Sequence, residues 1–99
     1  MNNKNEGTLR SMDLTELDVN ILLSLFINLL SAKAWQYIGL RIKPGTNKIE
    51  QNFEKAKLSI DCIVFLVEKL EDQLSDDEKG ELRSMITDLQ INFVNQLKS

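Results

Sequence analysis

Apolar residues recur at helical spacing along the second half of the chain. In residues 53–74 they alternate at intervals of three and four, the period of a helix with one buried stripe. Residues 76–97 carry a similar stripe, and Ser75 with Glu78 forms an S-x-x-E capping box. The break at Ser75 is short, so the two segments predict an antiparallel helix pair. The predicted stripes are Phe53, Ala56, Ile60, Ile63, Val67, Leu70 and Leu74, then Leu82, Met85, Ile86, Leu89, Phe93 and Leu97.

Residues 15–38 predict a further helix that is apolar over most of its circumference. On a wheel of about 100° per residue, Asn20, Ser24, Asn28 and Ser31 fill a sector of about 80°, and apolar residues fill an arc of about 240°. An ordinary surface helix needs a stripe only slightly wider than about 100°. Two neighbouring helices of the same chain cannot cover the remainder.

The ends of this helix and the following connection are marked by capping and turn residues. Either Thr15 with Asp18 or Asp13 with Glu16 fits an N-terminal cap, and Gly39 suits the C-terminal position that requires positive φ.

Residues 39–52 then form a long connection with a turn at Pro44, where Ile42 and Ile49 can flank a short hairpin. Asn52 is the expected N-cap of the helix that follows. Because the connection is long enough to return along the first helix, the relative direction of the two helices stays open.

Three environments compete for the uncovered apolar arc. A membrane span has the right length, but Asn20, Asn28, Lys33 and Gln36 interrupt it, and a central Lys costs roughly 2.5–3.5 kcal/mol. A peripheral membrane helix needs a polar face rich in Lys and Arg, whereas this face is Asn and Ser. A protein interface is therefore favoured, most simply a homodimer using the same patch twice, or else contact with a partner helix.

The helix at 53–74 adds a second apolar face on the side away from its stripe. We expect this face and the arc to form one interface, and we expect an isolated subunit to be unstable because burying large side chains contributes roughly 1.5–3 kcal/mol each. The predicted interface residues are Ile21, Leu25, Leu29, Trp35, Leu58, Phe65 and Leu66.

The composition limits the kinds of functional site that the chain can form. The 99 residues include no His and one Cys, which argues against metal sites, against Ser-His or Cys-His catalysis and against an internal disulfide. The formal charge of −3 argues against nucleic-acid binding. No catalytic residue, cofactor or metal is predicted, and a cytoplasmic location is expected.

Two polar residues lie within the apolar part of residues 53–74. Cys62 is expected to be a buried structural thiol, because no basic neighbour or helix N-terminus would activate it. Asp61 is expected to be a solvated carboxylate at the edge of the stripe; the alternative is a partly buried contact with Lys33.

Several short runs follow one another along the chain: Trp35–Leu40, Pro44–Asn47, Ala56-Lys57, Ile60-Asp61, Leu66, Glu68-Lys69, Glu78, Leu89 and Phe93-Val94. In their order and spacing they resemble the small bacterial proteins of the family called domain of unknown function 1844. The resemblance covers residues 17–94 and departs from the family pattern at Asn47 and at residues 73–75. It implies a small all-helical bacterial protein and no activity.

The sequence therefore predicts an all-α fold of three helices, at about 15–38, 53–74 and 76–97, in one domain spanning 13–99. Residues 1–12 are expected to be a disordered tail, with Met12 as an alternative start. The predicted function is a non-catalytic helical interaction module; the alternative is a peripheral membrane-associated adaptor.

Overall fold

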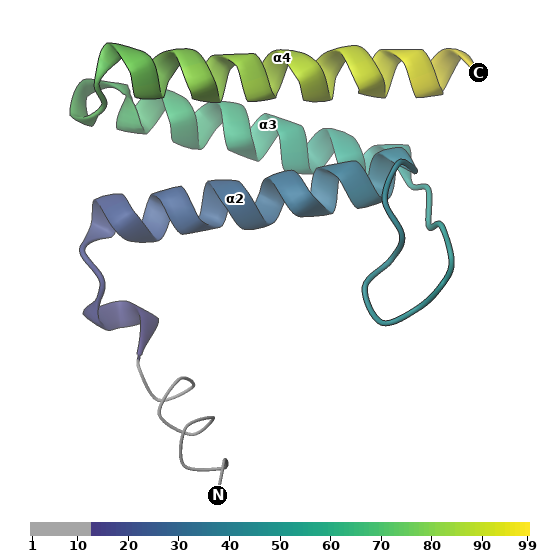
Figure 1. The fold of residues 1–99 in the computed structure, drawn as a ribbon, viewed down its shortest axis with the longest axis horizontal. Coiled ribbons are helices and arrows are strands. Elements are labelled where there is room, and N and C mark those ends of the chain that lie inside the picture. The colour runs from purple at the N-terminus through teal and green to yellow at the C-terminus, as the bar shows by residue number, and fades with distance from the viewer. Residues whose placement is uncertain (1–12) are drawn as a thin grey trace, which may run out of the picture.

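The computed structural model describes residues 13–99 and is all-α, as predicted. The helices are α2 (Val19–Ile38), α3 (Phe53–Leu70) and α4 (Asp76–Lys98), with 3₁₀ turns η1 (Leu14–Glu16) and η2 (Glu71–Gln73) before α2 and after α3 (Figure 1). Within residues 13–99, the only β-type pairing is an isolated antiparallel bridge between Ile42 and Ile49, where the hairpin was predicted. The predicted tail, residues 1–12, lies outside the described residues.

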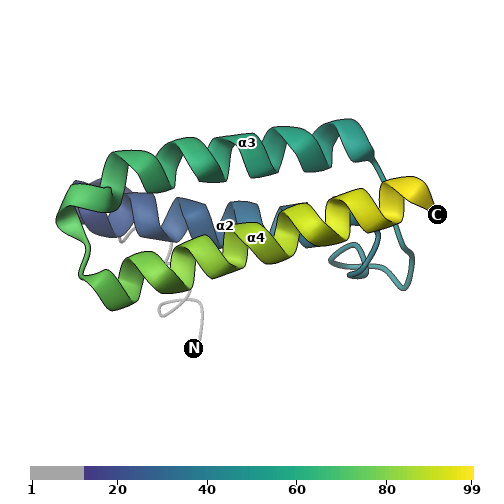
Figure 2. The same ribbon diagram turned by 90° about the horizontal axis from the view of Figure 1, so that it is seen from above.

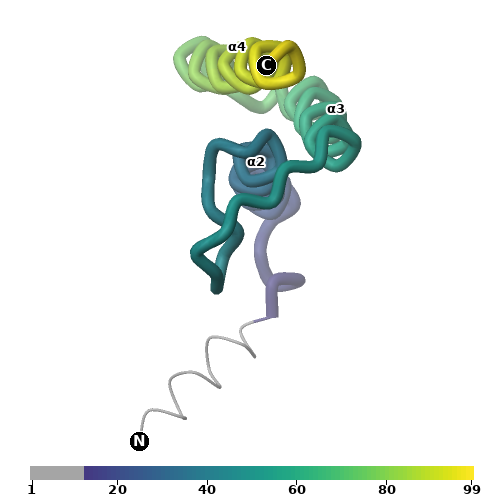
Figure 3. Tube along the Cα trace, turned by 90° about the vertical axis from the view of Figure 1, so that its right-hand side faces the viewer, coloured from purple at the N-terminus to yellow at the C-terminus, as the bar shows by residue number. Residues whose placement is uncertain are grey.

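The three helices run up, down and up. α3 lies beside both α2 and α4 and is antiparallel to each (Figures 1 and 2). The side chain of Asn20, at the start of α2, donates a 3.4 Å hydrogen bond to Gln73 Oε1, just after the end of α3. The end-on view places α3 to one side of the line joining α2 and α4 (Figure 3). The sequence left open how the first helix runs relative to the second, and the structure shows that α2 is antiparallel to α3.

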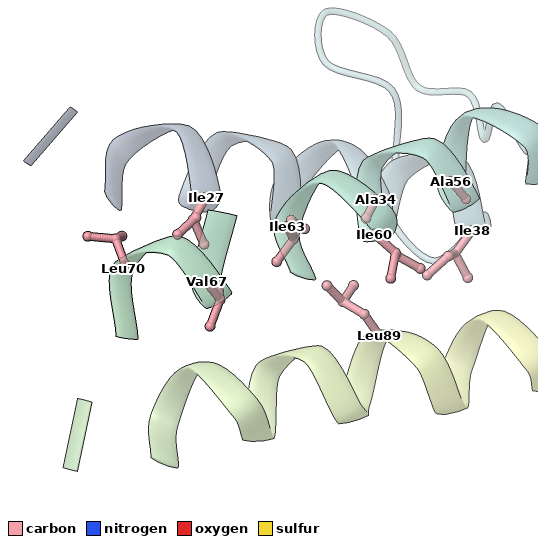
Figure 4. Close-up of a cluster of buried hydrophobic side chains, with 9 residues drawn as sticks. All are labelled: Ile27, Ala34, Ile38, Ala56, Ile60, Ile63, Val67, Leu70 and Leu89. Atoms are coloured by element: carbon pink, nitrogen blue, oxygen red, sulfur yellow. The ribbon is translucent and has the colours of Figure 1, made fainter. Parts of the chain in front are cut away.

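The core lies along α3, where all three helices meet. The stripe predicted for residues 53–74 supplies most of it, and α4 contributes one fully buried residue, Leu89. At the end of the bundle where α3 begins, the Phe53 and Phe93 rings pack edge to face with centroids 5.8 Å apart. The buried hydrophobic residues are Ile27, Ala34, Ile38, Ala56, Ile60, Ile63, Val67, Leu70 and Leu89 (Figure 4).

The caps of α3 and α4 form as predicted. Asn52 Oδ1 accepts from the backbone N–H of Lys55 at 3.0 Å, and the reciprocal capping box joins Ser75 and Glu78. Each bond satisfies a backbone donor that the first helical turn would otherwise leave unpaired.

The start of the first helix differs from the prediction. α2 begins at Val19 rather than near residue 15, and Asp18 occupies its N-cap position without a side-chain cap bond. Asp13 instead caps η1 by accepting from the backbone N–H of Thr15 at 3.4 Å. Leu17 is extended, so the 3₁₀ turn and α2 are separate elements.

A buried glutamine fastens the long connection to α2. Gln36 Oε1 accepts from Lys33 Nζ at 2.9 Å, while its Nε2 donates to Glu50 Oε1 at 2.8 Å. Gln51 adds a 3.0 Å bond from its Nε2 to the carbonyl of Ile38. Since a buried polar group is stable only when it is hydrogen-bonded, Gln36 fixes the connection against the helix end.

An exposed ion pair joins η2 to α4. Arg83 donates to Glu71 Oε1 at 2.8 Å. This hydrogen bond lowers the pKa of Glu71 and raises that of Arg83, because it favours the charged form of each group.

We predict that Gly39→Ala lowers the free energy of unfolding by about 1–3 kcal/mol. Gly39 has φ +97°, and an added Cβ would lie 2.8 Å from Gln51 Nε2. Urea denaturation followed by circular dichroism measures the change.

The matched control is Gly80→Ala in α4, where an added Cβ meets nothing within 4 Å. That variant should be more stable by about 0.5–1 kcal/mol, because Ala loses less backbone freedom than Gly in a helix. Equal stability changes in the two variants would contradict the role given to Gly39.

Candidate interaction surface

The polar sector of α2 lies beside the start of α4, and its members Ser24 and Asn28 remain exposed. Ser24 and Asn28 line a crevice whose opposite wall includes Glu78 and Glu81 at the start of α4. Asn20, in the same sector, is the residue hydrogen-bonded to Gln73. The polar side of α2 thus shares a crevice with the polar start of α4, and much of the apolar arc is left on the outside of the bundle.

On that outer side, α2 and α3 enclose an open apolar groove of about 550 Å³. Its carboxylate, Asp61, is paired with Lys57 on the same helix at 2.7 Å. The groove walls are formed by Phe26, Leu29, Leu30, Asp61, Cys62, Phe65 and Leu66.

Large apolar side chains around the groove remain in solvent. Leu29 is 54% exposed, Phe65 is 56% exposed, and Leu58, one turn before Cys62, is 63% exposed. A soluble monomer can expose isolated apolar residues at little consequence, but a contiguous apolar patch marks a binding surface or an aggregation site. We call Phe26, Leu29, Leu58, Phe65 and Leu66 the α2–α3 face.

The seven predicted interface residues fall into three groups. Leu29, Phe65 and Leu66 line the groove, and Leu58 lies beside it on α3. Ile21 is exposed but borders a second crevice, which it shares with Asn20 and Gln73. Their role in an interface stays a prediction.

The other two predicted residues are less exposed. Trp35 is half-buried and packs against the core, and Leu25 is half-buried on α2. The structure therefore does not place either residue in the groove.

The expectation of a buried Cys62 is wrong. The thiol is exposed and lines the groove, because α2 packs against the neighbouring side of α3 and leaves this position open. Asp61 is a solvated carboxylate, as expected. The alternative pairing with Lys33 does not form, since Lys33 donates to Gln36 and lies over the Tyr37 ring, 4.9 Å from its centroid.

Sequence reasoning left four groove residues out of the predicted interface, namely Phe26, Leu30, Asp61 and Cys62. Phe26 and Leu30 belong to the apolar arc, but the arc alone does not tell which of its members α3 covers. Cys62 was grouped with the second apolar face of residues 53–74, and its position on that face was the signal that it would lie at the surface. Gln36 had no signal, because its burial depends on the connection folding back over it.

The described residues give less support to a metal site or a membrane span. Within residues 13–99, no group of three or more Cys, Asp or Glu side chains is arranged to hold a metal ion. α2 is long and apolar enough to cross a membrane by length and composition, and only 22% of its apolar window is buried in the chain. A membrane contact and a protein contact would therefore use the same apolar surface of α2, which the chain leaves uncovered.

The chain belongs to the family described as domain of unknown function 1844, whose model matches residues 19–95, most of the sequence. The resemblance noted from the sequence is thereby confirmed. No curated protein and no solved structure matches the chain.

Ile63 and Leu58 lie five residues apart on α3, one in the core and one on the α2–α3 face. We predict that Ile63→Ala, at a fully buried site, lowers the free energy of unfolding by about 2–5 kcal/mol. Leu58→Ala, at an exposed site, should change it by no more than about 0.5 kcal/mol. Thermal denaturation at low protein concentration measures both; comparable losses would mean that Leu58 belongs to the core of the single chain.

Proposed function

We propose that this member of the family of domain of unknown function 1844 is a non-catalytic interaction module, acting in the cytoplasm, that docks an apolar protein surface on its α2–α3 face. The observation that carries this proposal is the apolar groove beside Leu29 and Phe65, which no element among residues 13–99 covers. Grooves between two helices accept the apolar side of a further helix in many protein complexes.

The polar features of the groove agree with a protein occupant. Asp61 has its own cation, Lys57, so an apolar occupant does not leave it without an ionic partner. The nine buried core residues include none from the face, and of the face residues only Leu66 packs against them (Figure 4). The face is therefore free to serve binding.

A peripheral membrane-associated adaptor is the second candidate. The observation that favours it is the length and apolar composition of α2. A helix that lies on an anionic membrane combines an apolar side with abundant Lys and Arg. α2 carries one such residue, Lys33, and Gln36 already accepts from its ammonium group.

A photo-crosslinking amino acid tests the protein-docking proposal in cells of the source organism. With p-benzoylphenylalanine in place of Phe65, we expect covalent protein adducts. The same amino acid at Ile91, which is 53% exposed on α4, should give none, and so controls for exposure.

Leu29→Asp tests whether the adducts depend on the groove. It should reduce the adducts from position 65 by about tenfold or more, because it removes an apolar contact worth roughly 1.5–3 kcal/mol and adds a charge. Circular dichroism should remain helical. The absence of adducts at position 65, or equal yields with and without Leu29→Asp, would overturn the proposal.

Vesicle sedimentation separates the two candidates. We predict that the protein stays in the supernatant with both phosphatidylglycerol and phosphatidylcholine vesicles. Sedimentation with either vesicle, abolished by Leu29→Asp, would favour the membrane adaptor instead.

A further inference from the structure

The outward side of α3 carries one row of residues with a defined order of charge. At spacings of four, three, four and four residues, the row reads Glu54, Leu58, Asp61, Phe65 and Lys69, so its members lie on one side of the helix. The two apolar members belong to the α2–α3 face. The row thus begins with an acid, ends with a base and is apolar between them.

The charges at the ends of this row have no ion-pair partner among residues 13–99. The described ion pairs join Lys43 to Glu50, Lys57 to Asp61 and Arg83 to Glu71. Lys69 lies over the Phe65 ring, 5.2 Å from its centroid, so its charge stands at the edge of the apolar face. Glu54 and Lys69 are separated by about 22 Å along the helix, because each residue adds 1.5 Å, and so they cannot pair within one chain.

We infer that the occupant of the α2–α3 face is a second copy of this chain, with the two α3 helices antiparallel about a twofold axis between Asp61 and Cys62. This inference rests on the proposed function. An axis at that position places Glu54 opposite Lys69 of the second copy and Leu58 opposite Phe65. A twofold interface must be self-complementary in this way.

The alternative arrangements lose this match. Two parallel copies in register would set Glu54 against Glu54 and Lys69 against Lys69. At the axis itself, each Asp61 already holds Lys57 at 2.7 Å, so two carboxylates can approach with their charges compensated. The groove on α2, which includes Leu29, extends the same contact beside α3.

Charge reversal tests the register, because the two partners of each proposed pair lie on different chains. In Glu54→Lys, both pairs of a dimer become Lys against Lys; in Lys69→Glu, both become Glu against Glu. Each variant alone should self-associate about tenfold more weakly than the wild type at low salt. The double variant, with both reversals in one chain, should recover wild-type association.

Mixing the two single variants gives the sharpest result. A heterodimer of Glu54→Lys with Lys69→Glu has opposite charges in both pairs, so it should exceed its statistical share in native mass spectrometry when one chain carries ¹⁵N. The stronger association of the mixture, measured by sedimentation, should fade at about 1 M salt, because charges are then screened within about 3 Å. The matched control is a mixture of Asp88→Lys and Lys98→Glu, which alters charges on α4 and should give the statistical share.

Each outcome decides one of the two claims. A wild-type chain that stays monomeric overturns the second copy as occupant, while the crosslinks from position 65 still judge the docking face itself. A wild-type dimer without preferential pairing of the two reversed variants overturns this axis and register. Recovery in the double variant and in the mixture supports both the occupant and the axis.

Discussion

The constraint that shapes this molecule is the apolar circumference of α2, which is wider than α3 and α4 can cover. α3 buries one side of α2 through residues such as Ile27, Ala34 and Ile38. The start of α4 then lies across a crevice from the polar sector of α2, where Ser24 and Asn28 stay exposed and Ile27 and Leu82 also line the walls. What remains is an apolar groove on the outside of the bundle, and the chain completes its own core without filling that groove.

The elements of the fold follow from local sequence, and their limits show where local signals stop. The stripe of residues 53–74, the capping box at Ser75 and the positive φ of Gly39 were readable because each depends on a few neighbouring residues. The start of α2 was misplaced because Asp13 caps a separate 3₁₀ turn and Leu17 is extended before α2 begins. The antiparallel direction of α2 depends on contacts far apart in sequence, such as Asn20 with Gln73, and the long connection permitted either direction.

The sequence predicted how much apolar surface the helices carry, but it did not predict the shape of the groove. Leu29, Phe65 and Leu66 were named from the two wide faces and line the groove. Cys62 was misjudged, and Trp35 lies outside the groove, because the sequence gives the width of a face, whereas the rotation of α2 against α3 decides which of its members stay outside. The burial of Gln36 under the connection at residues 39–52 could not be predicted from helical periodicity.

Sedimentation equilibrium of the wild-type chain tests the central claim, that a second copy covers the apolar face, most directly. At micromolar concentration we expect twice the mass of one chain, shifting toward the single-chain mass when Phe65→Asp places a charge on the face. Because Phe65 is not part of the core, we expect the variant to remain helical by circular dichroism, in contrast to the unstable isolated subunit expected from the sequence. A folded wild-type chain with the mass of one copy across the whole concentration range would contradict the account.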